Sequence, residues 1–400
     1  MAQTSLLSST ARDLLTSLAF APTSSPNLLA TSSIDGQVRV HARGSDTGAW
    51  TEICVFTAHE GGPVLKVVWA PMEWGAVLAT AGCEGAVRIW EETEDSAMGI
   101  LPSGQKRYAQ RAVLLDARGT IRDIGFAPAD LGLRIAAIAS DSHLRLYDCP
   151  SPSSNNGSGL STWSLLEDID VNTIPLVAGA SSSARTPSGV IRGFDMPASS
   201  AASLASGSAR SEDPSQLEAD GGWALCWCSD TFNGQLLAVS AGTSSAVRIL
   251  QMNPPNHWHQ VLVLQAVPHN VKEKKPSSSP APVCSVAWAP SSGRSYHLVA
   301  TGSRDGKVHV WKLRPPAPES SDVMSEGEWT SELAAEIDDH VSGGGISKVE
   351  WNITGTVLST AGDDGKARLW KAAFSGNEWK CVSTISCEDA DEEEEDDDSE

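Results

Sequence analysis

The stretch WNITGTVLSTAGDDGKARLWKA (residues 351–372) decides the fold, because it contains a unit that recurs along the chain. Trp351 ends one apolar segment, small residues follow, Asp364 and Gly365 form a turn signal, and an alternating segment ends at Trp370. An Asp-Gly pair between two such segments is typical of a tight β-hairpin, since glycine adopts the positive φ that the turn requires. The stretch therefore predicts three consecutive antiparallel strands.

The same pattern occurs six times, and the turn residue precedes the closing residue by six positions in every copy. The anchors are Phe20, Asp35 and His41; Trp69, Glu84 and Trp90; Phe126, Asp141 and Tyr147; Trp227, Ser244 and Leu250; Trp288, Asp305 and Trp311; and Trp351, Asp364 and Trp370. The fourth copy is degenerate, because its turn is Thr-Ser-Ser. Self-similarity of this kind indicates a repeat architecture.

A fourth strand follows in each copy. Five of these segments open with tryptophan, namely Trp50, Trp163, Trp258, Trp329 and Trp379, and the equivalent in the second copy is the stretch 108–115. Four short strands per unit are typical of a propeller blade. We therefore predict an all-β fold, a six-bladed β-propeller over residues 1–387.

Two segments depart from the repeat. Residues 175–220 are rich in Ser and Ala, and residues 388–400 contain eleven acidic residues in thirteen positions. Neither composition buries enough apolar surface to order itself, so we predict a disordered insertion and a disordered tail. The formal net charge is −21 and remains negative without the tail. An acidic body excludes direct nucleic-acid binding as the expected function. The apolar runs have the length of strands, so no transmembrane segment is expected.

The sequence predicts no catalytic residue, cofactor or metal site, and therefore no enzyme. The eight cysteines are scattered without a zinc-binding spacing, and no phosphate loop, nucleophile elbow or dinucleotide motif occurs. His59 with Thr80 and Trp90, and His340 with Thr360, Asp364 and Trp370, superficially resemble a catalytic triad. Because the constellation recurs between copies, we interpret it as a structural hydrogen-bond network.

Five arginines occupy one equivalent position on the third strands: Arg39, Arg88, Arg145, Arg248 and Arg368. If these arginines lined a central channel, they would be suited to binding a phosphopeptide. The position belongs to the face of a blade rather than to its inner rim, so we predict solvated strand arginines instead.

The turn carboxylate, the His, the Thr and the closing Trp resemble the hydrogen-bond network of WD40 repeats. Four stretches resemble the Seh-type WD40 nucleoporins more specifically: 351–372 with NEWKC (377–381), 67–92, 126–148 with STWSLLEDI (161–169), and 288–311. The resemblance covers the chain except the Ser/Ala-rich insertion and the acidic tail. The WD40 protein of the outer COPII coat, a sister family, shares some of these elements.

This resemblance implies a scaffold subunit of the outer-ring Y complex of the nuclear pore, which serves transport of mRNA and protein. It also implies the SEA/GATOR complex, which regulates TOR signalling at the lysosome or vacuole. The expected partners are an α-solenoid nucleoporin that donates a blade, other Y-complex subunits and SEA/GATOR subunits. The alternatives are a COPII coat component and a substrate-receptor adaptor of a ubiquitin ligase.

The family propeller is open, and a partner completes it. The sequence agrees, because the first repeat starts near Leu14 and the last ends with its own fourth strand, which leaves no terminal strand to close the ring. We therefore expect the partner to bind the inner strands of the terminal repeats. The candidate residues are Leu15, Leu18, Phe20, Ile346, Val349 and Trp351. Strand alternation sends about half of them toward the gap and leaves open which half.

Overall fold

The structure is a computed structural model of the 400-residue chain. It describes residues 7, 11, 13–22, 27–44, 48–93, 107–150, 159–174, 220–253, 257–266, 281–316, 328–340, 344–373 and 378–386. The predicted insertion at 175–220, apart from residue 220, and the predicted tail at 388–400 lie outside these residues.

Six four-stranded sheets make up the described structure. The first three blades comprise β1 (Leu15–Phe20), β2 (Leu28–Ser33), β3 (Gln37–Arg43) and β4 (Trp50–Thr57); β5 (Val64–Trp69), β6 (Val77–Gly82), β7 (Val87–Thr93) and β8 (Arg107–Leu114); and β9 (Ile121–Phe126), β10 (Arg134–Ala139), β11 (His143–Asp148) and β12 (Ser164–Asp170). The last three comprise β13 (Ala224–Trp227), β14 (Leu236–Ser240), β15 (Val247–Asn253) and β16 (His257–Leu264); β17 (Val283–Trp288), β18 (His297–Ser303), β19 (Val308–Arg314) and β20 (Thr330–Ile337); and β21 (Ile346–Trp351), β22 (Val357–Gly362), β23 (Lys366–Ala372) and β24 (Trp379–Ser386).

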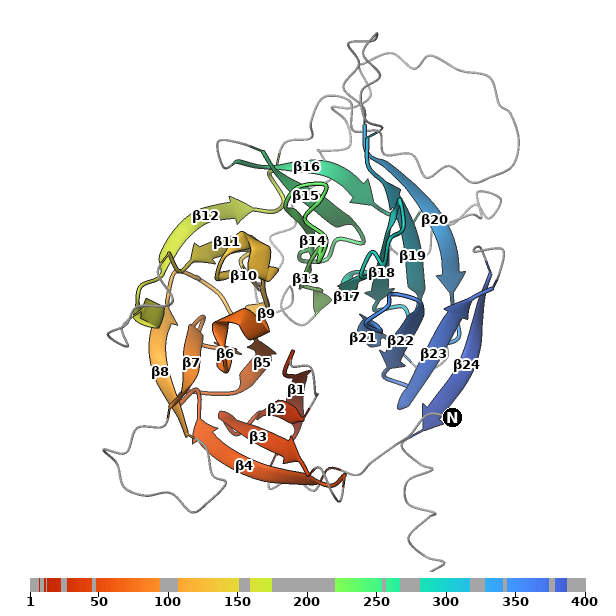
Figure 1. Cartoon of the computed structure of the whole chain (residues 1–400). Helices are drawn as coiled ribbons and strands as arrows, with labels where there is room; N and C mark the ends of the chain where they lie inside the picture. The colour runs from red at the N-terminus through yellow and green to blue at the C-terminus, as the bar shows by residue number, and fades with distance from the viewer. Residues whose placement is uncertain are drawn as a thin grey trace, which may run out of the picture.

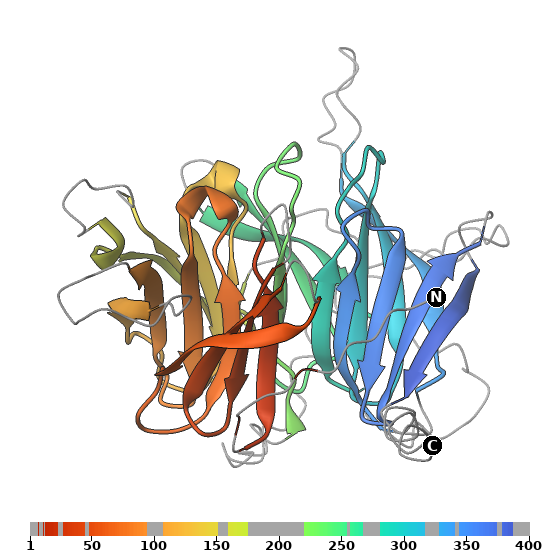
Figure 2. The ribbon, with the colours of Figure 1, turned by 60° about the horizontal axis from the view of Figure 1, so that its bottom comes forward.

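Each sheet is an antiparallel meander in chain order, and the sheets stand around a common axis as the blades of a propeller (Figure 1). In the view turned by 60°, most strands of the fifth and sixth blades run from one end of the ring to the other (Figure 2). The all-β, six-bladed prediction is confirmed, including the fourth strand of every blade. No helix among the described residues is long and apolar enough to span a membrane.

The core lies between the blades rather than within one of them. Ala79 and Ile89 of the second blade pack with Ile124 and Tyr147 of the third, and four further clusters join neighbouring faces in the same way. Burial on both faces explains the near-continuous apolar segments such as VLATAG, because every face that meets a neighbour must lose its water.

Five of the six possible junctions between neighbouring blades are formed. The inner strands pack in order, β1 on β5, β5 on β9, β9 on β13, β13 on β17 and β17 on β21. Among the described residues, β21 and β1 have no comparable contact, and Figure 1 shows the sixth and first sheets standing apart. One face of each of these two blades therefore lacks the neighbour that covers its counterparts.

Candidate partner-binding site

The six inner strands share a four-residue register, which we call the inner-strand quartet. It occupies residues 17–20, 66–69, 123–126, 224–227, 285–288 and 348–351. The second residue lies opposite an equivalent residue of the next strand: Leu18 opposite Thr31, Val67 opposite Thr80, and Val349 opposite Thr360. The quartets can therefore be compared position by position.

The second and fourth quartet positions face the preceding blade. In blades two to six the second residue is at most 7% exposed. In the first blade the same two positions hold Leu18 and Phe20, which are 58% and 54% exposed. The apolar pattern is thus the same in all six strands, but in the first blade it has no neighbour to pack against, which leaves favourable burial unused.

The sixth blade is uncovered on its opposite face. Val77, Ala79 and Ala81 of the second blade are 0% exposed because the third blade packs on them. Their counterparts Val357 and Ser359 of β22 are half-buried. The β22 side chains on this face are short, which suits the close approach of another sheet.

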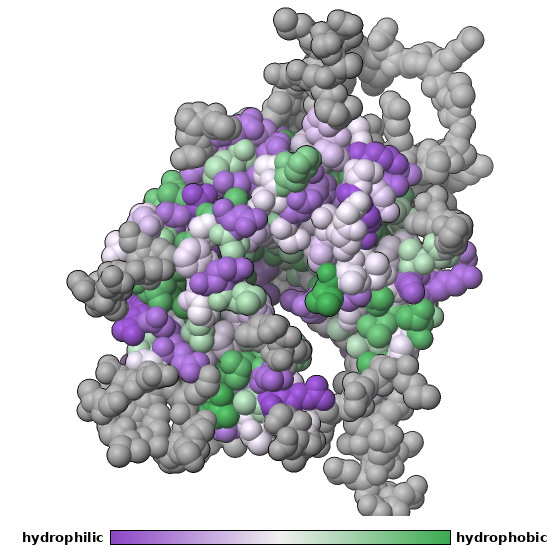
Figure 3. Space-filling model, in the orientation of Figure 1, coloured by the Kyte–Doolittle hydropathy of each residue, from purple (hydrophilic) through white to green (hydrophobic). Residues whose placement is uncertain are grey.

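The two uncovered faces meet at one opening. In the space-filling view the front of the molecule is hollowed at its centre, and the hollow continues outward between the first and sixth blades (Figure 3). The central cavity has a volume of about 900 Å³, and its lining includes Leu15 and Leu18 from the first blade and Lys348 and Glu350 from the sixth. An extended segment that enters the opening would reach both blades from this cavity.

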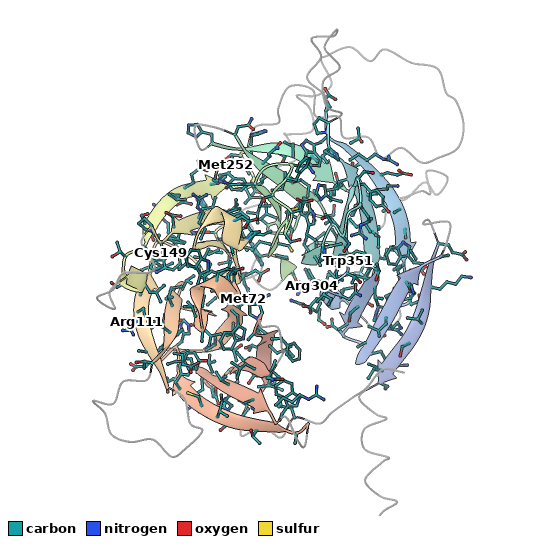
Figure 4. All side chains as sticks on the ribbon, in the orientation of Figure 1. Met72, Arg111, Cys149, Met252, Arg304 and Trp351 are labelled. Carbon is teal, nitrogen blue, oxygen red and sulfur yellow. The ribbon has the colours of Figure 1, made fainter. Side chains whose placement is uncertain are left out.

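The structure divides the six sequence-predicted residues into two groups of three. Leu15, Leu18 and Phe20 are 45%, 58% and 54% exposed, and the ring of Phe20 lies 5.9 Å from that of Trp50 at the start of β4. The other three, Ile346, Val349 and Trp351, are 2%, 1% and 9% exposed and pack on the fifth blade. Trp351 also donates a hydrogen bond to the carbonyl oxygen of Ala287 (3.2 Å), and Figure 4 labels it where these two sheets meet.

Ile346, Val349 and Trp351 thus belong to the half of the predicted set that faces the neighbouring blade, and Leu15, Leu18 and Phe20 to the exposed half. The residues of that blade on the uncovered face are Lys348, Glu350, Val357, Ser359 and Leu369. No signal in the sequence identifies them, because the face that each blade turns to its predecessor is set only in the assembled ring. Because the second and fourth quartet positions always face the preceding blade, the last blade must present its first and third positions to the gap.

The His-Thr-Trp constellations are hydrogen-bond networks inside single blades. Trp90 Nε1 donates to Thr80 Oγ1 (3.0 Å), which lies 2.8 Å from His59 Nε2, and His59 Nδ1 contacts Glu84. The sixth blade repeats the arrangement with Trp370, Thr360, His340 and Asp364. Thr80 and His59 are at most 1% exposed. A nucleophile requires an accessible hydroxyl, so the geometry provides strand-to-strand stability instead.

The strand arginines differ from the expectation. Two of them are buried and not solvated: Arg39 and Arg145 are 2% and 1% exposed, and they pair with the turn carboxylates of Asp35 (2.8 Å) and Asp141 (2.7 Å). Arg368 makes the same pair with Asp364 at 2.6 Å. The sequence argument missed this because it treated the turn carboxylate and the arginine separately. None of the five arginines belongs to the lining of the central cavity.

Acidification is expected to weaken the fold through the buried histidines. Burial lowers the pKa of His59, and also those of His41, His259, His297 and His309. A histidine whose folded pKa is depressed binds its proton more readily when unfolded, so stability is lost as pH falls below about 6.5, by up to about 1.4 kcal/mol per pH unit for each such group.

Urea midpoints measured between pH 7.5 and pH 5 test this expectation. The midpoint should fall with pH, and the fall should be shallower in a His59→Gln variant. A midpoint that stays constant over this interval would contradict the expectation.

Comparison with known proteins agrees with the repeat architecture. The family model described as WD domain, G-beta repeat matches residues 273–312 and 331–371. Nucleoporin SEH1 of Saccharomyces cerevisiae is 32% identical over 391 residues, which cover 90% of this chain and 93% of that protein. Nucleoporin seh1 of Schizosaccharomyces pombe is 28% identical, with 89% of each chain covered. Nucleoporin SEH1 of Homo sapiens is 29% identical, and the alignment covers 89% of this chain and 81% of that protein.

Six four-stranded blades, together with this family match, define the class as a WD40-repeat β-propeller. The Trp-Thr-His networks of the second and sixth blades agree with this class. Within the class, the chain belongs to the nucleoporin SEH1 family.

Proposed function

We propose that this protein is a non-enzymatic scaffold subunit of the Y complex in the outer ring of the nuclear pore, and that an α-solenoid nucleoporin completes its propeller by donating a blade. The uncovered faces of the first and sixth blades carry this proposal. Leu18 exposes an apolar side chain at a position that every other blade buries, and Phe20 exposes one at a position that the other blades bury or half-bury. Family membership supports the place of action, since the relatives are named nucleoporins.

Blade donation would cover the two uncovered faces as a neighbouring blade covers the others, so burial of apolar surface would supply the affinity. The donated strands, which we call the guest blade, would pack one face on Leu18 and Phe20 and the other on the half-buried residues of β22. The central cavity is continuous with the opening between the first and sixth blades. The inner strand of the guest blade would therefore line this cavity, as the six resident inner strands do.

The family also implies membership of the SEA/GATOR complex at the lysosome or vacuole, as a second location of the same scaffold. The same surface would serve both assemblies, because the propeller has one pair of uncovered faces among its described residues. The two assemblies would then compete for this subunit.

Affinity purification of the tagged full chain from its own cells, followed by mass spectrometry, tests the assignment. Nuclear-pore scaffold subunits should be recovered in near-stoichiometric amounts, together with SEA/GATOR subunits in a smaller fraction. Recovery of COPII coat subunits or ubiquitin-ligase subunits, without pore subunits, would overturn the proposal.

The guest blade is expected to stabilise the chain. A partner that binds only the folded state adds about 2.7 kcal/mol at a concentration of 100 Kd, because folding and binding are linked. Thermal unfolding of the purified chain should therefore shift upward when the co-purified donor is added. The donor should have no such effect on a Leu18→Glu variant, and an unchanged melting temperature of the native chain would count against blade donation.

A further inference from the structure

The junction between the second and third blades contains an ion pair at the first quartet position. Lys66 Nζ lies 2.7 Å from Asp123 Oδ1, and both side chains are largely buried, at 22% and 11% exposure. Asp123 Oδ2 in turn accepts the backbone N–H of Leu225 in the fourth blade (3.0 Å). One carboxylate thus links a lysine of the preceding blade to the backbone of the following blade.

The fifth blade uses the same position in a similar way. Ser285 Oγ accepts the backbone N–H of Val349 in the sixth blade at 3.0 Å. The first quartet residue therefore reaches toward the inner strand of the next blade, either to its first residue or to the N–H of its second. Its chemistry determines what the next blade must provide.

In the sixth blade this residue is Lys348, whose next neighbour would be the guest blade. An ammonium group has three donors and no acceptor, so any group of that neighbour that pairs with it must be an acceptor. No hydrogen bond or ion pair links the Lys348 ammonium to the described part of the chain. The positive charge of Lys66, followed by burial, lowers the pKa of Lys348, although the carboxylates of Asp123 and Glu350 act in the opposite direction. The anions around this ammonium group therefore do not fully compensate its charge.

A second contact recurs at the fourth quartet position. Trp69 Nε1 donates to the carbonyl oxygen of Ala19 (3.0 Å), Trp227 to that of Gly125 (3.0 Å), and Trp351 to that of Ala287 (3.2 Å). Each acceptor is the third quartet residue of the preceding blade. The corresponding acceptor for the guest blade is the carbonyl oxygen of Glu350.

We propose, on the basis of the blade donation inferred above, that the inner strand of the guest blade carries the sequence carboxylate–apolar–any–tryptophan in register with the resident quartets. Its carboxylate pairs with Lys348 as Asp123 pairs with Lys66. Because Leu18 occupies the same quartet position as Leu225, the second carboxylate oxygen accepts the N–H of Leu18. The tryptophan donates to Glu350, and Lys348 selects the guest and fixes its register.

Zero-length cross-linking tests this pairing directly. A carbodiimide joins an ammonium to a carboxylate without a spacer, so it reports only groups in contact. The complex purified through the tagged full chain is treated with carbodiimide, and its cross-linked peptides are sequenced. The Lys66–Asp123 link within the chain serves as the internal positive control. We expect a second link, from Lys348 to a partner carboxylate that is followed by an apolar residue, any residue and tryptophan.

Two variants measure the energetic role of the contact. Lys348→Glu places like charges in contact and should reduce donor affinity by roughly thirtyfold or more. Lys348→Arg keeps the charge but does not react with carbodiimide, so it should retain the donor and lose the cross-link. Charge reversal of the identified partner carboxylate to lysine should restore binding to the Lys348→Glu chain.

The outcomes separate this inference from the proposed function. If Leu18→Glu releases the partner while Lys348 forms no cross-link, or while Lys348→Glu keeps full affinity, the pairing is wrong and blade donation stands. If neither Leu18→Glu nor Lys348→Glu releases the partner, blade donation itself is wrong. A cross-link to a carboxylate outside the expected sequence would overturn the register.

Discussion

Leu18→Glu is expected to abolish binding of the guest blade while the chain remains folded. Leu18 is 58% exposed in the chain alone, so a glutamate at this position stays solvated and has little effect on the fold. In the complex the same side chain would be covered by the guest blade. Burying an unpaired carboxylate costs several kcal/mol, which corresponds to a loss of donor affinity of about a hundredfold or more. The measurement is donor pull-down together with the thermal transition of the free chain.

Leu166→Glu is the matched control for this variant. Leu166 is 44% exposed but lies on the outer strand β12 of the third blade, away from the opening. This variant should retain the donor at the level of the native chain. Normal donor binding by the Leu18→Glu chain would show that the interface lies elsewhere.

Val349→Glu is expected to unfold the sixth blade, although Val349 and Leu18 occupy the same quartet position. Val349 is 1% exposed and packs so closely on the fifth blade that a Cβ atom added at Gly302 would clash with Ile346 and Val349. A buried, unpaired carboxylate in so tight a junction costs about 3–5 kcal/mol. Domains are stable by only about 5–15 kcal/mol, so this is a large fraction of the total.

Ile353→Glu in the loop between β21 and β22 is the control for that substitution, because Ile353 is 92% exposed in the same blade. It should leave the urea midpoint nearly unchanged, whereas Val349→Glu should lower it strongly and expose the sixth blade to limited proteolysis. A Val349→Glu chain with a native midpoint would mean that the packing between the fifth and sixth blades contributes little to stability.

The contrast between these two variants shows what the sequence could predict about the site. Leu18 and Val349 are both apolar residues in equivalent strands, and the sequence predicted both as partner-binding. Alternation along a strand specifies two faces but does not specify which neighbour each face meets. The direction in which the blades follow one another around the axis is a property of the assembled ring, so the sequence alone left the question open.

The arginines illustrate the same limit on a smaller scale. The six-residue offset from the turn residue to the closing residue predicted the hairpins correctly. In the same hairpins, Asp35 and Asp141 precede Arg39 and Arg145 by four residues. The structure shows that these charges pair within the hairpin and are removed from water. Burial of that position depends on the adjoining parts of the fold, which the local pattern does not contain.

The sequence by itself determined the elements that depend on neighbours along the chain: six repeats, four strands in each, the hairpin turns and the Trp-Thr-His networks. These are local, because a blade is a meander whose hydrogen bonds join consecutive strands. Only the tertiary structure decided which apolar faces are covered. Each face is buried or exposed according to whether another blade stands beside it, and between the sixth and first blades the described chain supplies none. The uncovered surface is therefore a property of the ring, not of any one repeat.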